Sequence, residues 1–321
     1  MRGMPRLARL LRCSVQAIFT LWLLSAIIFS AMSLVKGDAV TQQLSGTASR
    51  EQISALRTQL GLDQPLVRRY LHWVSGVLRG DWGNSYVSGR PVSKLLWERG
   101  QFSLALGATA SILLVIIAIT AGVYCGLHPG SLTDRLISTL SVGMVALPEF
   151  VTGTLLVVVF ALTLHWLPAL SLISPTASLW SQWSLFVLPV LTLLSVSLAQ
   201  NIKLIRLGVI QASHSSACEC ARLNGVSEPR VVLHWIIPPA LGHCMPVLMR
   251  YITYLFGGAL IAETLFGWPG LAAALLNATL SRDTPVVMGI AMVICTLTVL
   301  LNLLADVLTS LLHPAARPEV A

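Results

Sequence analysis

Ionisable side chains inside otherwise apolar segments are the residues of this sequence best placed to do chemistry. Glu149, Arg250 and Glu263 each interrupt an apolar run, and Glu149 directly follows Pro148. A charge inside a membrane is costly, so such residues commonly mark a substrate or ion pathway. A proline there also frees backbone groups that need new partners. We expect these three residues to act on a translocation path or in gating. The alternatives are an internal ion pair between Glu149 and Arg250 and structural capping by Glu263.

The motifs of common enzymes are missing from the sequence. There is no G-x-x-x-x-G-K-[ST] phosphate-binding run, no G-x-G-x-x-G and no H-E-x-x-H, and the histidines are scattered. Cys218 and Cys220 form a C-x-C pair that offers at most a soft-metal site. We therefore predict that the chain is not an enzyme, has no catalytic residue, and binds no metal or cofactor itself. A membrane-embedded enzyme built on Glu149 and intramembrane histidines is the alternative from another class, and it would need a cluster of acids, bases or ligands.

The composition is that of an integral membrane protein. Of the 321 residues, 55% are hydrophobic and 11% charged, whereas soluble domains carry about 25% charged residues. The net charge of +8 is in this context a topology signal, and we expect no nucleic-acid partner. A helix needs about 20 apolar residues to cross a bilayer. The segments that satisfy this are 13–35, 101–127, 136–164, 185–202, 243–266 and 284–305.

Basic residues near the ends of these segments set the predicted orientation, because they favour the cytoplasmic side. They precede the first span at Arg2, Arg6, Arg9 and Arg12, and they recur after the fourth at Lys203, Arg206, Arg222 and Arg230. The long first loop is basic too, but loops beyond about 60 residues are largely exempt from this rule. The predicted organisation is a cytoplasmic amino terminus at 1–12, a first transmembrane helix at 13–35, a periplasmic loop region at 36–100, a core of five transmembrane helices at 101–310, and a cytoplasmic tail at 311–321.

Two glycines of the second span predict a close helix contact. Gly122 and Gly126 have the small-xxx-small spacing that lets transmembrane helices approach one another.

The first loop is predicted to hold two short helices. Ser49 and Gln52 have the spacing of a capping box, and Gly61 is expected to end the helix that they begin. A second helix is expected after Pro65 and to stop at Gly80. It has an apolar face, which predicts packing against the membrane or the bundle, or an external docking surface. The residues of this face are Leu66, Val67, Tyr70, Leu71, Val74, Val77 and Leu78.

The segment 207–241 is too polar to span a membrane, and its pattern predicts a helix, a turn and a second helix. Residues 215–224 read as a short helix, and Gly225 follows at a position suited to a left-handed turn. Pro229 is expected at the start of the second helix, and Pro238 and Pro239 are expected to end it. Such an elbow between two spans would act as a rigid lever that moves both.

Several sequence runs resemble one family of bacterial membrane proteins. They are A-R-L-N-G at 221–225, I-I-P-P-A-L at 236–241, L-G-L-D-Q-P-L at 60–66, G-D-W-G-N-S at 80–85, E-T-L-F-G-W-P-G-L at 263–271 and R-D-T-P-V-V at 282–287. Together they cover nearly the whole chain, and along the chain they occur in the order that the family has. The chain resembles the inner-membrane permeases of ABC importers in the dipeptide, oligopeptide and nickel family, with nickel-type permeases the most similar.

The resemblance implies a fold and a set of partners. The expected fold is all-α, with six transmembrane helices of the type I ABC importer permease and a periplasmic loop after the first. The chain would form half of a translocation pathway in the bacterial inner membrane, surrounded by lipid, with both termini cytoplasmic. A second permease would complete a heterodimer, two ATPase subunits would use ATP and Mg, and a periplasmic binding protein would deliver the cargo.

The resemblance also assigns roles to particular residues. The predicted ATPase-coupling residues are Glu219, Ala221, Arg222, Gly225, Pro238 and Ala240, and the other family-motif residues are Asp81, Gly83, Trp268, Pro269, Gly270, Arg282 and Asp283. Ser215, Ser216 and Ala217 stand where the family usually carries an acidic residue and a tyrosine, and Pro239 stands in the place of an asparagine. We expect Glu219 and Arg222 to replace the missing charges toward the ATPase.

The cargo is read from two weaker features. The connection between the third and fourth spans is short, and the runs at 164–170 and 197–206 resemble nickel-type permeases. Nickel or a metal–metallophore complex is therefore the favoured cargo, and a dipeptide or oligopeptide is the alternative.

Overall fold

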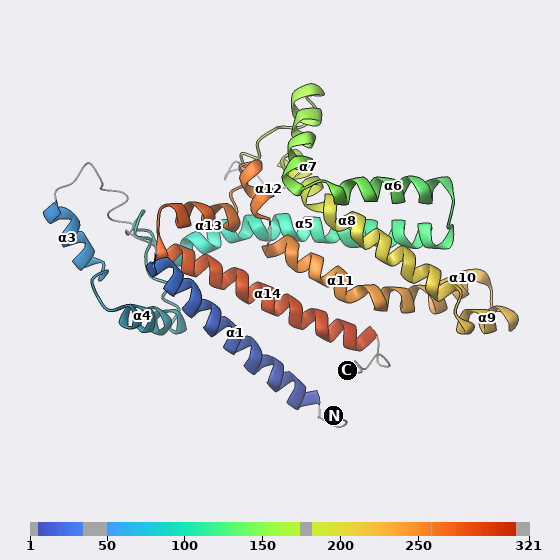
Figure 1. Cartoon of the computed structure of the whole chain (residues 1–321), viewed down its shortest axis with the longest axis horizontal. Helices are drawn as coiled ribbons and strands as arrows, with labels where there is room; N and C mark the ends of the chain where they lie inside the picture. The colour runs from blue at the N-terminus through green and yellow to red at the C-terminus, as the bar shows by residue number, and fades with distance from the viewer. Residues whose placement is uncertain (1–5, 35–49, 174–181, 258, 313–321) are drawn as a thin grey trace. The chain divides into compact units, whose positions relative to one another are not determined.

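The computed structural model describes residues 6–34, 50–173, 182–257 and 259–312. Regular structure in these ranges is helical, apart from one isolated bridge between Asn84 and Pro91. The elements, shown in Figure 1, are α1 (Arg6–Leu34), α3 (Arg50–Gln59), α4 (Leu66–Leu78), α5 (Val92–Leu127), α6 (Leu132–Ala146), α7 (Glu149–Leu156), the π-helical turn η1 (Val157–Thr163), α8 (Ser184–Ser213), α9 (Ser216–Leu223), α10 (Glu228–Val231), the π-helical turn η3 (Val232–Ile236), α11 (Ile237–Gly257), α12 (Leu260–Leu265), α13 (Leu271–Leu280) and α14 (Thr284–Leu312).

The number of apolar helices agrees with the predicted spans. Among the described residues, 5 helical stretches are long and apolar enough to cross a membrane, and the count is 6 when the bent pair α6 and α7–η1 is taken as one span. The bounds differ from the prediction at the ends: the first helix begins at Arg6, the second at Val92, and the fourth runs on to Ser213. We placed the predicted ends of the spans at charged residues. The helices continue past these residues because lysine and arginine are good helix formers.

The third span is not the single helix that was predicted. Its two halves meet at an angle of 110°, and α7 leaves α6 steeply in Figure 1. Leu147 has an extended backbone (ψ 131°) and Pro148 follows it. The ring of a proline disfavours helical backbone in the preceding residue, and the proline has no N–H to donate. Pro148 therefore places Glu149 at the first position of a new helix.

The fifth span also differs from the prediction, at both ends. It is divided into α11 and α12, and α11 begins at Ile237 without a break after η3. Pro238 and Pro239 therefore do not end the second elbow helix, and the prediction that they do is wrong. The π-helical turn η3 directly precedes them, and local π-helical geometry and nearby side chains can satisfy the backbone groups that a proline frees inside a helix.

The chain divides into two compact units. The first contains residues 1–103 and 269–299. Its core is formed where the start of α5 meets α13 and α14, with the end of α1 packed alongside. A methyl group on Gly289 would lie 2.6 Å from Val92 Cγ1, so α14 and α5 touch closely there. The buried core residues are Val92, Leu271, Ala278, Val286, Val287 and Ile290.

The two loop helices of the first unit form as predicted, although Ser49 lies outside the described residues. Gly61 (φ +66°) and Gly80 (φ +84°) follow α3 and α4 in the left-handed conformation. Only part of the apolar face of α4 packs: Tyr70 hydrogen-bonds Ser25 at 2.8 Å and lies 5.4 Å from the Phe29 ring. Four residues of that face remain exposed, namely Leu66, Val67, Leu71 and Leu78.

The second unit contains residues 104–268 and 300–321. Helix α8 is its centre and packs against α6, α7 and α11. Helix α5 approaches α8 through the two predicted glycines: a methyl group on Gly122 would lie 2.7 Å from Ile205 Cβ, and one on Gly126 2.6 Å from Val209 Cβ. The small-xxx-small prediction is confirmed.

Candidate functional site: a coupling elbow and three polar contacts

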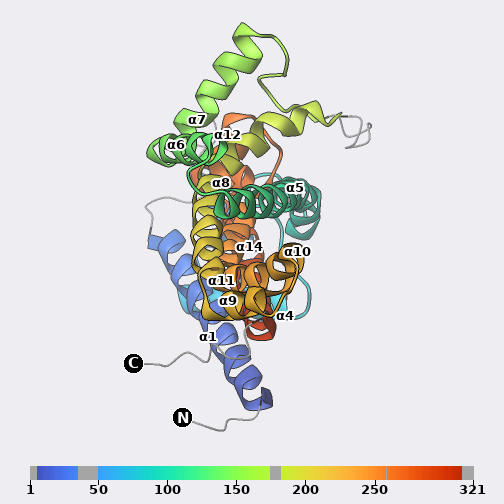
Figure 2. The same cartoon turned by 90° about the vertical axis from the view of Figure 1, so that its right-hand side faces the viewer.

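The segment between α8 and α11 folds into the predicted elbow. Ser215 caps α9 by accepting a hydrogen bond from Cys218 N at 3.4 Å, and Gly225 turns the chain at φ +76°. Pro229 then lies in the first turn of α10. Figures 1 and 2 show α9 and α10 at one end of the α8–α11 pair. The elbow is thus attached directly to two helices that pack along each other.

The inner side of the elbow is closely packed. Cys218, Val231 and Ile236 are 0% exposed, and the predicted coupling residues Ala221 and Ala240 are buried too. The Cys218 thiol donates to the backbone oxygen of Trp235 at 3.6 Å. That oxygen lies four residues before Pro239, which has no N–H to bond it. Cys218 therefore satisfies a carbonyl group that the proline leaves free. In the described part of the chain, no group of three or more histidine, cysteine or acidic residues is placed to hold a metal.

Arg222 closes the elbow from outside. Its Nη2 and Nε lie 2.7 and 3.1 Å from the two carboxylate oxygens of Glu228, and its Nη1 donates to Ser213 O at 3.3 Å. The hydrogen bond to Glu228 raises the pKa of Arg222 above its ordinary value. The side chain therefore joins the end of α8 to the start of α10. Arg222 was predicted to bind the ATPase, but it is engaged within the elbow itself, whereas Glu219 is exposed.

The outer side of the elbow carries apolar groups in contact with solvent. Leu223 is 81% exposed and Trp235 44%. A shallow depression is lined by Val226, Arg230, His234 and Trp235. We call Leu223, Val226, Arg230, His234 and Trp235 the elbow surface. Large apolar side chains gathered at one place are typical of a protein interface.

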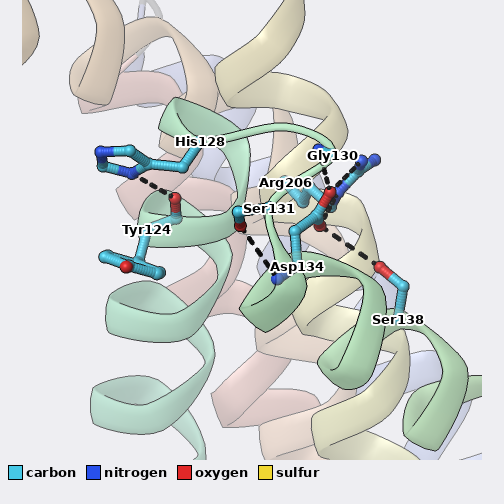
Figure 3. A network of polar contacts seen from close by, with 7 residues as sticks. All are labelled: Tyr124, His128, Gly130, Ser131, Asp134, Ser138 and Arg206. Carbon is cyan, nitrogen blue, oxygen red and sulfur yellow. Dashed lines mark hydrogen bonds and ion pairs between the residues drawn. The ribbon is translucent and has the colours of Figure 1, made fainter.

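A buried ion pair lies in the same unit, and sequence reasoning missed it (Figure 3). Asp134 near the start of α6 binds Arg206 of α8 through two hydrogen bonds, Nε–Oδ1 at 2.5 Å and Nη2–Oδ2 at 2.8 Å. Gly130 N donates to the same carboxylate at 2.8 Å, and Ser138 Oγ at 3.4 Å. The side chains are 3% and 24% exposed. The two residues are 72 positions apart in sequence, so no local sequence pattern predicts the contact.

The intramembrane Glu149 finds a partner other than the predicted one. Tyr254 donates to Glu149 Oε2 at 2.5 Å, and its neighbour Tyr251 donates to Gln200. The second oxygen, Oε1, is buried and has no hydrogen-bond partner among the described residues. Arg250 is exposed. The predicted ion pair between Glu149 and Arg250 is not formed, because Tyr254, one helical turn further along α11, occupies the carboxylate.

Glu263 and Trp268 form a tight turn at the end of α12. Both are 1% exposed. Trp268 N donates to Glu263 O at 2.8 Å, and Gly267 between them has φ +65°. The Trp268 ring packs edge-on against Phe186, 4.6 Å between centroids. This burial favours the structural reading of Glu263. Pro269 and Gly270 follow, and Gly270 directly precedes α13.

The remaining family-motif residues meet in the first unit. Asp283, just before α14, accepts a hydrogen bond from Ser85 Oγ at 2.5 Å and from Tyr86 N at 3.0 Å. Asp81 closes a turn by accepting from Gly83 N at 2.9 Å. A carboxylate at a helix amino terminus is also favoured by the helix dipole. The loop after α4 is therefore fixed to the start of α14. Arg282 beside it has φ +58°.

The comparisons with known proteins agree with this arrangement. The family described as "Binding-protein-dependent transport system inner membrane component" matches residues 118–318, and the model of the N-terminal part of such components matches residues 6–107. The chain belongs to this family of ABC importer permeases. The permease is accordingly a multi-pass protein of the inner membrane, and its relatives are transport subunits that work with ATPase and substrate-binding subunits.

The relatives of the permease extend over nearly the whole chain. The glutathione transport system permease protein GsiC of Escherichia coli (strain K12) is 32% identical over 298 residues, 93% of this chain and 95% of that protein. The protein of the same name from Shigella flexneri serotype 5b is 31% identical over the same length. These names do not support the nickel cargo that the sequence favoured.

A solved structure shows the fold. The crystal structure of an amino acid ABC transporter with histidines matches the permease with a TM-score of 0.50 and 18% identity, covering 68% of this chain and 94% of that chain. At this identity the likeness concerns the fold alone, and it agrees with the predicted type I permease fold.

Proposed function

We propose that the permease forms half of the translocation pathway of an ATP-driven importer. Its elbow would receive the conformational change of an ATPase subunit and pass it to the membrane helices. The observation that carries this is the elbow itself, whose exposed apolar surface is joined to α8 through His214 and Ser215 and runs into α11 without a break. One ATPase subunit would dock on the elbow surface, and a second ATPase on the equivalent elbow of a second, non-identical permease. A periplasmic binding protein would deliver the cargo on the other side.

The coupling follows from how the elbow is fastened. Arg222 joins α10 to the end of α8, and Cys218 is packed against η3. A displacement of the elbow is therefore passed to both helices instead of being absorbed in the turn. ATP binding would shift the transporter to the outward-open state only if the ATPase contacts differ between the two states. The position of the elbow at the end of the α8–α11 pair supports this assignment.

For orientation, we infer that the elbow and both termini face the cytoplasm. Basic residues of the elbow region support this, because Lys and Arg favour the cytoplasmic side of short loops. The exposed charges there include Arg222 and Arg230.

For the cargo, we propose a small peptide-like molecule in place of nickel. Two observations support it. Relatives 32% identical over 93% of the chain are named for glutathione, which is a tripeptide. The described residues include no cluster of three or more potential metal ligands that would favour a metal ion.

The elbow assignment is tested by substitution of Gly225. Tryptophan is strained at φ +76°, whereas asparagine tolerates the left-handed conformation. In cells that carry the complete transporter, we expect Gly225→Trp to reduce uptake of labelled glutathione or dipeptide severely and Gly225→Asn to retain most of it. Labelled nickel, free and chelated, is measured in parallel. Equal uptake by both variants would refute the elbow assignment, and loss confined to nickel would refute the peptide cargo.

A further inference from the structure

We propose that Arg250 of α11 and Glu149 of α7 form a binding site on the translocation pathway. This site would bind the two charged ends of a small zwitterionic peptide. The carboxylate of the cargo would pair with Arg250 and its ammonium group with Glu149, with the Tyr254 hydroxyl between them. This inference rests on the proposed function, and it assigns the cargo contacts within the second unit.

The first observation is a polar stripe on an exposed helix face. His243, Arg250 and Tyr254 are all exposed and recur at the spacing of one side of α11. Other sides of the same helix are buried, at Ala240, Cys244, Leu248 and Leu255. A cation facing hydrocarbon is strongly disfavoured, and such residues normally face a bundle interior or a water-filled path. The stripe is therefore the side of α11 that faces the pathway.

The second observation is an unmet acceptor beside the stripe. Tyr254 donates to Glu149 Oε2, and Oε1 is buried with no partner in the described part of the chain. Buried polar atoms are almost always satisfied. A donor that reaches Oε1 when the pathway opens would satisfy it, and an ammonium group supplies both the donor and the opposite charge.

The third observation is the spacing of the two charges. Arg250 and Tyr254 are one turn apart, a rise of about 6 Å, and Tyr254 reaches Glu149 directly. The charged ends of an extended dipeptide or tripeptide are separated by roughly 7–11 Å, at about 3.5 Å per residue. A molecule of this size matches the axial spacing of Arg250 and Tyr254 better than a free amino acid does.

The same charges disfavour a bare metal ion. A divalent cation next to Glu149 would also meet the guanidinium of Arg250, and like charges repel strongly where water is scarce. The group that binds the carboxylate is the Tyr254 hydroxyl, and a phenol is a weak metal ligand compared with carboxylates, thiolates or imidazoles.

The test measures binding to the purified transporter without its binding protein, so that the latter cannot discriminate among ligands. Equilibrium dialysis uses labelled alanyl-alanine, its N-acetyl derivative, its C-terminal amide and ⁶³Ni²⁺. We expect the free dipeptide to bind best, because each charge-assisted hydrogen bond contributes about tenfold in affinity. Arg250→Gln should lose that factor toward the free and acetylated peptides but not toward the amide. Glu149→Gln should lose it toward the free peptide and the amide but not toward the acetylated form.

Three variants complete the design. Arg250→Lys keeps the positive charge and should retain most of the binding. Arg135→Gln removes an exposed cation of α6 away from the stripe and should leave all affinities unchanged. Each variant must copurify with the same amount of ATPase as the original chain, which excludes a general loss of fold.

The inference is overturned if the original transporter does not bind the free dipeptide, if both blocked peptides bind equally well in all variants, or if Glu149→Gln abolishes nickel binding instead. These outcomes are distinct from a failure of the proposed function. If the proposed function were wrong, the permease would not copurify with any ATPase, or Gly225→Trp would leave uptake unchanged.

Discussion

At the scale of single residues, the Asp134–Arg206 pair makes the sharpest prediction about stability. Asp134→Asn would leave the guanidinium of Arg206 without its buried counter-charge. Removal of one member of a buried ion pair costs about 3 kcal/mol or more. We expect a clear fall in the thermal unfolding midpoint of the detergent-purified transporter. Arg135→Gln, which neutralises the exposed neighbour, should stay within about 0.5 kcal/mol of the original. If both substitutions lowered the unfolding midpoint equally, the ion pair would contribute no more to stability than an exposed charge does.

Tyr86 makes a prediction about alkaline pH. Its burial raises the pKa of the phenol, an effect that nearby Arg69 opposes in part. A group with a raised pKa in the folded state contributes stability below its unfolded pKa of about 10, and this contribution is lost as the pH rises through the folded value. Tyr86→Phe should therefore lose less stability than the original chain between pH 9 and about 11. The measurement is the unfolding midpoint at each pH, and parallel curves would contradict the prediction.

At the scale of the elements, the contact between α5 and α8 depends on glycine. A methyl group on Gly126 would lie 2.6 Å from Val209 Cβ and 2.9 Å from Arg206 O, whereas one on Gly143 of α6 meets nothing within 4 Å. Gly126→Ala should push the helices apart, lower the unfolding midpoint and weaken the neighbouring Asp134–Arg206 pair. Gly143→Ala should be neutral or stabilising by up to about 1 kcal/mol. A stabilising Gly126→Ala would show that the two helices are not held at this distance.

Local signals predicted the elements well where the chain itself supplies the cause. The left-handed glycines at Gly61, Gly80 and Gly225 and the position of Pro229 followed from backbone sterics alone. The bend at Pro148 was missed because apolar composition continues across it. Pro238 and Pro239 were expected to end a helix, but Cys218, a distant residue, bonds one of the carbonyl groups left free. The sequence pattern contains no information on that partner.

The candidate sites were predictable in their parts but not in their connections. The runs at 80–85 and 282–287 were recognised separately, and only the structure shows that Ser85 and Asp283 bond each other. Arg222 was expected to face the ATPase, and the sequence did not show that it also binds Glu228 within the elbow. Tyr254 replaced Arg250 as the partner of Glu149. The packing of the helices decides which of several nearby polar groups bond to each other. The spacing of residues in the sequence does not show these pairings.

At the scale of the whole molecule, the native Cys220 provides a test of orientation. It is exposed on the elbow, and Cys125, Cys218 and Cys244 are buried. A membrane-impermeant thiol reagent should label Cys220 only after the cells are opened, and Cys220→Ser should remove that signal. A cysteine placed at Asp63 in the first loop should react in intact cells. Labelling of Cys220 in intact cells would reverse the proposed topology.

The Asp134–Arg206 pair also bears on how the permease is assembled. Protein synthesis starts at the amino terminus, so Asp134 enters the membrane before Arg206 has been made. Until α8 is inserted, the carboxylate must remain at the water interface or take up a proton, since an unpaired charge in hydrocarbon is disfavoured. Arrival of α8 completes the contact and buries it. A chain that stalls between the two helices therefore exposes an unpaired acidic group.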